Sequence, residues 1–223
     1  MLKLAKQLMT VWCQALLLLC CTLNLVDSFA PSPVFQRHKY KNSFRLTRHT
    51  RAGVQELQKK YKEQAWWNEY FEDRSRQLKD LPSLSTDFYS WLNLTAWDRL
   101  HAAFWDLQTF QTKLERKRTE LEEEEKEKLT RKGGRQTLSA KIQHIQLDLR
   151  DLMNQISSQM TYMRSSWTKP TFPSVTETSS RTTTTVWDSR LEGYIILRDL
   201  DLYLTKLARD FLLLASKLLM TQQ

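Results

Sequence analysis

Leu138 to Met163 reads LSAKIQHIQLDLRDLMNQISSQMTYM, and this stretch decides the fold class. Its large apolar side chains recur at alternating intervals of four and three residues, from Leu138 and Ile142 to Met160 and Met163. This spacing places them along one face of an α-helix, and such a face needs other helices to shield it from water. The stretch therefore predicts a helix over about residues 136–164 that packs inside a bundle.

Three further amphipathic patterns lie on either side of this stretch. The leucine-rich C-terminal part predicts a helix over about residues 188–219. Another helix is predicted over about 95–128, where the Thr95 hydroxyl and Asp98 can cap the first turn. The weakest pattern predicts a helix over about 43–71. No alternation of apolar and polar residues competes with these patterns, so the sequence predicts an all-α fold.

The lengths of the predicted loops indicate how the helices connect. Residues 131–135 form a short turn with two glycines, which can only bring the second and third helices together as antiparallel neighbours. The loops at about 72–94 and 165–187 hold roughly twenty residues each, enough to cross the length of a bundle. We therefore expect a long-chain four-helix bundle with up-up-down-down topology. A simple up-down bundle and an extended coiled coil are alternatives, but neither explains both long loops.

The N-terminal segment, residues 1–30, has the layout of a signal peptide. Two lysines precede an apolar run from Leu8 to Leu25, and Ser28 and Ala30 place small residues where signal peptidase reads them. We expect cleavage after Ala30 and secretion of residues 31–223 as one domain. A signal anchor that holds a type II membrane protein is the alternative. All three cysteines lie in the expected signal peptide, so the secreted chain would carry no disulfide.

The composition points to a binding protein. The formal net charge is +9, which in a secreted chain favours acidic receptor surfaces or heparan-type polyanions over nucleic acid. The four histidines lack metal-ligand spacing, and neither a nucleophile-and-base arrangement nor a phosphate-binding loop is found. We therefore predict that the protein binds other proteins, with no catalytic residue, no metal and no cofactor.

Two local motifs concern the surface. Asn93-Leu94-Thr95 is an N-glycosylation acceptor just before a predicted helix, which makes Asn93 the candidate glycan site. Within the acidic run from Glu120 to Glu127, the stretch Glu122 to Glu125 predicts a solvated helix face that pairs with Lys126, Lys128 and Arg131.

Three stretches resemble a known family. They are Gln146–Leu152 (QLDLRDL), Leu94–Leu100 (LTAWDRL), and Thr184–Trp187 (TTVW) followed by the leucine-rich helix that contains LARDFLLLASK. Together they are similar to the interleukin-27 alpha type within the interleukin-6 and interleukin-12 family of long-chain four-helix cytokines. The acidic run departs from the mammalian pattern, in which a long glutamate run lies in the loop between the third and fourth helices.

The resemblance implies a secreted cytokine subunit that acts in immune regulation. It implies pairing with a soluble receptor-like beta subunit to form a heterodimer, and signalling through the shared interleukin-6 signal transducer and a dedicated receptor. Carried onto this sequence, Trp97, Leu100 and Arg209 would contact the beta subunit. Trp187 would contact the shared transducer.

The residues give independent expectations for both tryptophans. Trp187 follows the polar stretch 179–185, so we expect a partly exposed ring that suits a binding hot spot. The alternative is that Trp187 folds over the end of the bundle as a hydrophobic staple. Trp97 lies one turn before Leu100 and suits the core as well as an interface.

Two other classes of protein are open at this point. One is a single-subunit cytokine of the ciliary neurotrophic type, which would share the bundle but signal alone. The other is a basic coiled-coil scaffold, either anchored to a membrane or bound to polyanions.

Overall fold

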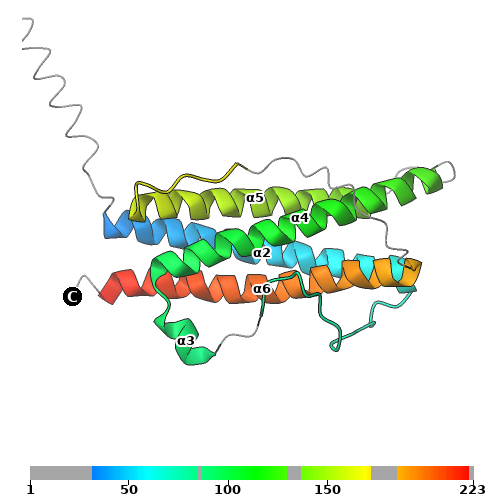
Figure 1. Ribbon diagram of the computed structural model, residues 1–223, viewed down its shortest axis with the longest axis horizontal. Coiled ribbons are helices and arrows are strands. Elements are labelled where there is room, and N and C mark those ends of the chain that lie inside the picture. The colour runs from blue at the N-terminus through cyan, green and yellow to red at the C-terminus, as the bar shows by residue number, and fades with distance from the viewer. Residues whose placement is uncertain (1–31, 85–86, 130–136, 172–184, 221–223) are drawn as a thin grey trace, which may run out of the picture. The chain divides into compact units, whose positions relative to one another are not determined.

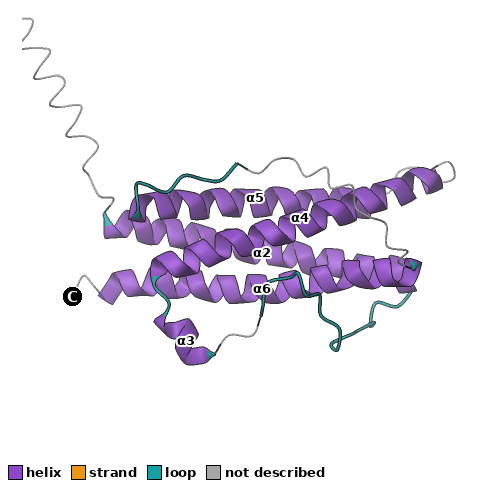
Figure 2. Cartoon of the chain, viewed as in Figure 1, coloured by secondary structure: helices purple, strands orange, loops and turns teal. Residues whose placement is uncertain are grey.

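The computed structural model describes residues 32–84, 87–129, 137–171 and 185–220 (Figure 1). These residues contain five helices and no strand, which confirms the all-α prediction (Figure 2). The helices are α2 (Pro33–Trp66), α3 (Phe88–Asn93), α4 (Ala96–Leu129), α5 (Leu138–Met163) and α6 (Val186–Met220). The expected signal peptide and the glycine-containing turn at 131–135 lie outside the described residues. Within the described residues, no helix combines the length and apolar character needed to cross a membrane.

The four long helices pack into a bundle. The helix α2 lies against α5 and α6, and α4 also lies against α5 and α6. The most extensive contacts join α2 to α6 and α4 to α5. The apolar face predicted for α5 points into the core, where Leu149, Leu152 and Ile156 are completely buried. Apolar spacing on α5 was therefore a correct guide to burial.

The helix α2 begins at Pro33, earlier than the expected start near residue 43. Its extra turns bury Tyr40, and the turns that follow bury Ser43, Thr47 and Thr50, which are polar and so escape a search for apolar spacing. These hydroxyls are satisfied inside the protein: Thr47 donates to the Ser43 carbonyl at 2.7 Å, and Ser43 donates to Gln155 Oε1 at 2.7 Å. Hydrogen-bonded hydroxyls can be buried at little cost, so this half of α2 packs largely through hydroxyl side chains next to the buried Tyr40 ring.

The end of α2 is set by Trp67, which has a φ of 56° in the left-handed region. The Trp67 N–H donates to the Glu63 carbonyl at 3.1 Å, as in a helix that ends with a single left-handed residue. Glycine is the usual residue in this conformation because a Cβ is disfavoured there. The chain leaves the helix at this point, five residues before the expected end near residue 71.

Threonine caps define the starts of α4 and α6. The Thr95 hydroxyl accepts the Asp98 N–H at 3.1 Å, which confirms the cap predicted for α4. The same arrangement occurs at α6, where the Thr185 hydroxyl accepts the Asp188 N–H at 3.1 Å. Thr185 is therefore the cap, and Asp188 lies inside the first turn instead of before it. As a result Trp187 belongs to the helix itself.

Candidate functional site

Aromatic rings gather where α2 ends and α6 begins. The Trp66 and Phe71 rings stack with centroids 4.1 Å apart, and the Trp187 ring lies roughly perpendicular to both, with centroids at 5.7 and 6.2 Å. Tyr194, about two turns further along α6, packs edge-on against Phe71 at 5.3 Å. We call Trp66, Phe71, Trp187 and Tyr194 the aromatic end cluster. Edge-to-face and stacked contacts of this kind fix ring orientation.

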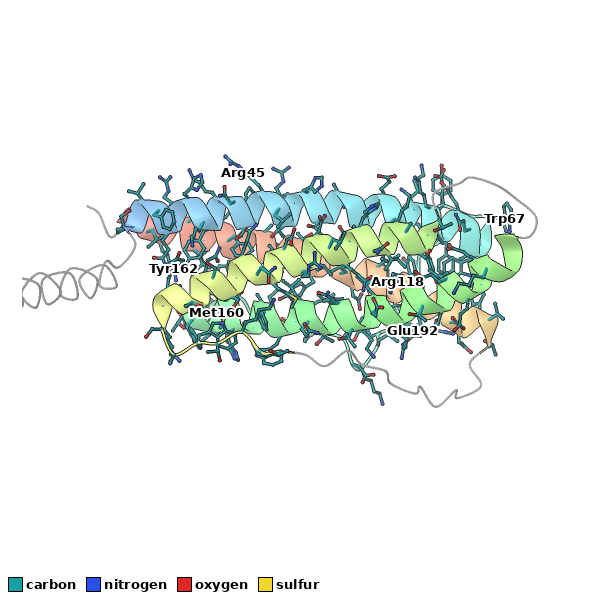
Figure 3. The ribbon with its side chains drawn as sticks, turned by 90° about the horizontal axis from the view of Figure 1, so that it is seen from above. Arg45, Trp67, Arg118, Met160, Tyr162 and Glu192 are labelled. Carbon is teal, nitrogen blue, oxygen red and sulfur yellow. The ribbon has the colours of Figure 1, made fainter. Side chains whose placement is uncertain are left out.

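Part of the aromatic end cluster faces solvent. The Trp187 side chain is 48% exposed although its ring contacts two others. Next to the cluster, Trp67 and Tyr70 are 93% and 81% exposed, and Trp67 is seen at the end of α2 in Figure 3. A shallow depression of about 570 Å³ lies between Trp187, Leu191 and the chain from Phe71 to Arg76. Large exposed aromatic side chains beside a shallow depression are typical of a protein-binding surface.

Hydrogen bonds hold the helix ends that carry these rings. The Arg190 guanidinium donates to the Ala65 carbonyl at 3.0 Å and so caps the end of α2. The buried Tyr61 hydroxyl donates to the Arg190 carbonyl at 3.1 Å, and burial raises the Tyr61 pKa. Gly193 allows this approach, because a Cβ there would lie 2.2 Å from the Tyr61 hydroxyl. The rings therefore stand on a rigid junction of two helices.

The loop after the cluster is fastened to α6 as well. The Arg198 guanidinium donates to the Asp73 carbonyl at 2.6 Å and to the Arg76 carbonyl at 2.8 Å. Its Nε donates to Asp199 Oδ1 at 2.8 Å. One arginine therefore fixes the segment that forms a wall of the depression.

Trp187 combines the two expectations from the sequence, a partly exposed ring and a staple over the end of the bundle. One edge of the ring packs on Trp66 and Phe71 at the bundle end, as a staple would, and about half of the side chain remains exposed. Sequence reasoning missed Trp66, Phe71 and Tyr194 as supports for Trp187. The nearest signal was the Trp66-Trp67 pair at the end of a predicted helix.

The residues expected at the beta-subunit interface lie in different surroundings. Leu100 is 1% exposed and is a core residue, so its side chain offers no surface to a partner. Trp97 is partly buried between the Arg164 guanidinium, 4.1 Å from its ring centre, and the Trp167 ring at 5.8 Å. Arg209 is exposed on α6.

A second tryptophan, Trp91 on α3, occupies a polar anchor that sequence reasoning missed. Its indole Nε1 donates to Asp210 Oδ1 at 2.7 Å, and Arg99 donates to the same oxygen at 2.5 Å. Arg99 also donates to the Trp91 and Leu92 carbonyls, so it binds the end of α3. We call Trp91, Arg99 and Asp210 the charged anchor. It joins α3, α4 and α6.

The remaining predictions concern the glycan site, the acidic run and metal binding. Asn93 is exposed as the last residue of α3, so it is accessible for a glycan. The Thr95 of its motif also caps α4. Part of the acidic run is paired with basic residues that precede it, which were not predicted as its partners: Glu120 lies 2.5 Å from the Lys117 ammonium, and Glu122 pairs with Arg118. Among the described residues no group of histidine, cysteine and carboxylate side chains could hold a metal ion.

Comparison with protein-family models and with curated proteins finds no match to this chain.

Proposed function

We propose that this chain is a secreted cytokine subunit of the interleukin-27 alpha type. In this proposal it pairs with a soluble receptor-like beta subunit, and the heterodimer signals through the shared interleukin-6 signal transducer and a dedicated receptor in immune regulation. The observation that carries the proposal is the half-exposed Trp187 in the first turn of α6, held by rings of its own chain. The resemblance implies a receptor contact at this same position.

We also propose the up-up-down-down topology of long-chain cytokines. Its support is the direction of the chain in Figure 1, where the colours advance from left to right along α2 and α4 and from right to left along α5 and α6. Two long connections, between α2 and α4 and between α5 and α6, are what this arrangement requires.

The proposed transducer site is the aromatic end cluster with Trp67 and Tyr70. A binding hot spot needs a large side chain that is rigid before the partner arrives, because ordering it on binding would cost conformational entropy. Trp187 meets this condition through its contacts with Trp66 and Phe71. Trp67 and Tyr70 add exposed aromatic area around it.

For the beta subunit we propose the surface formed by α3 and the adjacent part of α6. On α3, Phe88 and Tyr89 are exposed and their rings lie 5.6 Å apart. On α6, Arg209 precedes Asp210, which bonds to α3 through Trp91. The charged anchor would hold this surface in place before the partner binds. Trp97, in the first turn of α4 after α3, remains a candidate because it is only partly buried.

Co-expression with soluble receptor-like chains tests the proposal. We expect one such chain to co-purify with this protein and to raise its secretion, because a partner that binds the folded state stabilises it. Efficient secretion of a stable monomer, together with full signalling in the absence of any partner, would instead support the single-subunit cytokine.

Two similarly exposed tyrosines make a matched pair of variants for the two surfaces. Tyr89→Ala should weaken capture of the beta subunit and leave transducer binding intact, whereas Tyr70→Ala should do the reverse. If both variants change the same interaction, or neither changes any, the assignment of two surfaces is wrong.

A further inference from the structure

The outer face of the first half of α2 carries a strong positive charge. Between Pro33 and Gln55 the helix has six lysines and arginines and no aspartate or glutamate. Lys41, Arg45 and Arg48 follow each other at intervals of four and three residues, and all three are exposed. Figure 3 shows Arg45 directed away from the bundle. We call Lys41, Arg45 and Arg48 the basic stripe; His38 and His49 flank it.

The basic stripe has no acidic partner in the described part of the chain. Other cations of α2 are paired: Arg51 lies 2.8 Å from Asp201, and Lys60 lies 2.9 Å from Glu56. No ion pair within 32–84, 87–129, 137–171 and 185–220 includes a member of the basic stripe. Arg48 instead makes a cation–π contact with the Phe44 ring, whose centre is 5.8 Å from the guanidinium.

The positive charges of the basic stripe, unpaired within the described residues, destabilise the folded state. Like charges three and four residues apart repel one another on a helix. On α4 the chain avoids the same problem, because Arg118 is flanked by Glu115 and Glu122. A run of charges that costs stability and contributes nothing to the core is typical of a binding function.

We propose that the basic stripe binds a linear sulfated polysaccharide of the heparan sulfate class. The stripe places one cation on each turn of a rigid helix, so its charges advance by roughly 5 Å per turn along a straight line. A linear polyanion can follow such a line and releases its counterions on binding. The inference rests on the proposed function in one respect only, that the protein is secreted and meets extracellular polysaccharides.

Other polyanions fit the stripe less well. Single-stranded nucleic acids are bound by cations interleaved with exposed aromatic rings on which bases stack. Phe44, the aromatic residue beside the stripe, is partly buried under Arg48. A membrane-surface helix inserts an apolar face into lipid, but the apolar face of α2, with Tyr40, Val54 and Leu57, is buried in the bundle.

The test uses the full secreted chain and a heparin-derived dodecasaccharide in physiological salt. Lys41→Gln/Arg45→Gln/Arg48→Gln removes the basic stripe. The matched control, Lys79→Gln/Lys126→Gln/Arg150→Gln, removes three exposed positive charges that lie elsewhere. We expect the stripe variant to lose about tenfold or more in affinity and the control less than about threefold, with a shallower salt dependence for the stripe variant alone.

Three results would overturn the proposal. They are no binding by the wild type, equal losses in the two triple variants, and equal or tighter stripe-dependent binding to a single-stranded oligonucleotide or to phosphatidylserine vesicles. Lys41→Arg/Arg45→Lys/Arg48→Lys keeps the charge and should bind as the wild type does, which separates charge from a folding defect. Capture of the beta subunit by the stripe variant is measured separately. If the beta subunit is captured but wild type and stripe variant bind the polysaccharide equally, only the polysaccharide proposal fails; if no beta subunit is captured, the proposed function fails.

Discussion

Trp187 on α6 and Trp91 on α3 lie at opposite parts of α6, and they are held in different ways. Near its start, Trp187 is fixed by ring contacts with Trp66 and Phe71 and stays half exposed. About 35 Å further along, at the helical rise of roughly 1.5 Å per residue, Asp210 binds Trp91 through the indole N–H and pairs with Arg99. The Arg99 side chain is 1% exposed.

The difference separates a structural site from a binding site. The buried Arg99 uses both terminal nitrogens of its guanidinium for hydrogen bonds, and this ion pair cannot open to a partner without leaving a charge unpaired. Ring contacts at a helix end orient a side chain and leave its outer face free. The charged anchor therefore maintains the fold, and the aromatic end cluster is the better candidate for recognition.

The largest effect should follow from Asp210→Ala. This change leaves the buried Arg99 guanidinium and the Trp91 indole N–H without their acceptor, so we expect the free energy of unfolding to fall by about 3–5 kcal/mol. Urea denaturation of the purified protein measures it. Asp201→Ala is the control: it breaks a partly exposed pair with Arg51 and should cost less than about 1 kcal/mol. Equal costs would show that the charged anchor is no more structural than a surface pair.

A smaller loss is expected from Gly193→Ala, which tests the junction under the aromatic end cluster. The new Cβ would meet the Tyr61 hydroxyl at 2.2 Å, so the two helices must separate or Tyr61 must move, at about 1–3 kcal/mol. In Gly53→Ala the Cβ meets only the flexible end of Ile145 at 2.9 Å, and the better helix propensity of alanine should offset that contact. Thermal denaturation that ranks Gly53→Ala as the more damaging change would contradict the close approach.

The smallest effect concerns an exposed carboxylate. Hydrogen bonds from Lys60 and Lys141 lower the Glu56 pKa from 4.5 to about 2. A lowered pKa stabilises the folded state above about pH 4.5, and this contribution is lost as the pH falls toward 2. Glu56→Gln should therefore lower the melting temperature slightly at pH 7 and converge with the wild type near pH 2. A constant difference across this range would show that the pKa shift contributes nothing to stability.

The sequence predicted those parts of the fold that depend on apolar spacing. The helix α5 was found because Ile142, Leu149 and Ile156 repeat along one face. The first turns of α2 were missed because Tyr40 is followed at the next buried positions by the polar Ser43, Thr47 and Thr50, so no apolar period runs through this part of the helix. The helix α3 was missed because its six residues are too short to show a period.

Local sequence patterns predicted only part of the candidate site. Trp187 was identified from its position between a polar stretch and a helix, but its supporting rings come from α2 and the chain after it. The pairing of Arg99 with Asp210 joins residues 111 positions apart, and local pattern carries no information on such a contact. Leu100 was assigned to an interface by resemblance, whereas its 1% exposure makes it a core residue.

The most direct test of the account is the affinity of Trp187→Ala for the shared signal transducer, measured on the heterodimer. We predict a loss of more than about 2 kcal/mol, roughly thirtyfold, while the free energy of unfolding changes by less than about 1.5 kcal/mol. Trp105→Ala is the control, since Trp105 is similarly exposed, at 40%, but lies on α4 away from the cluster. Unchanged affinity in Trp187→Ala, or a loss that Trp105→Ala reproduces, would contradict the assignment.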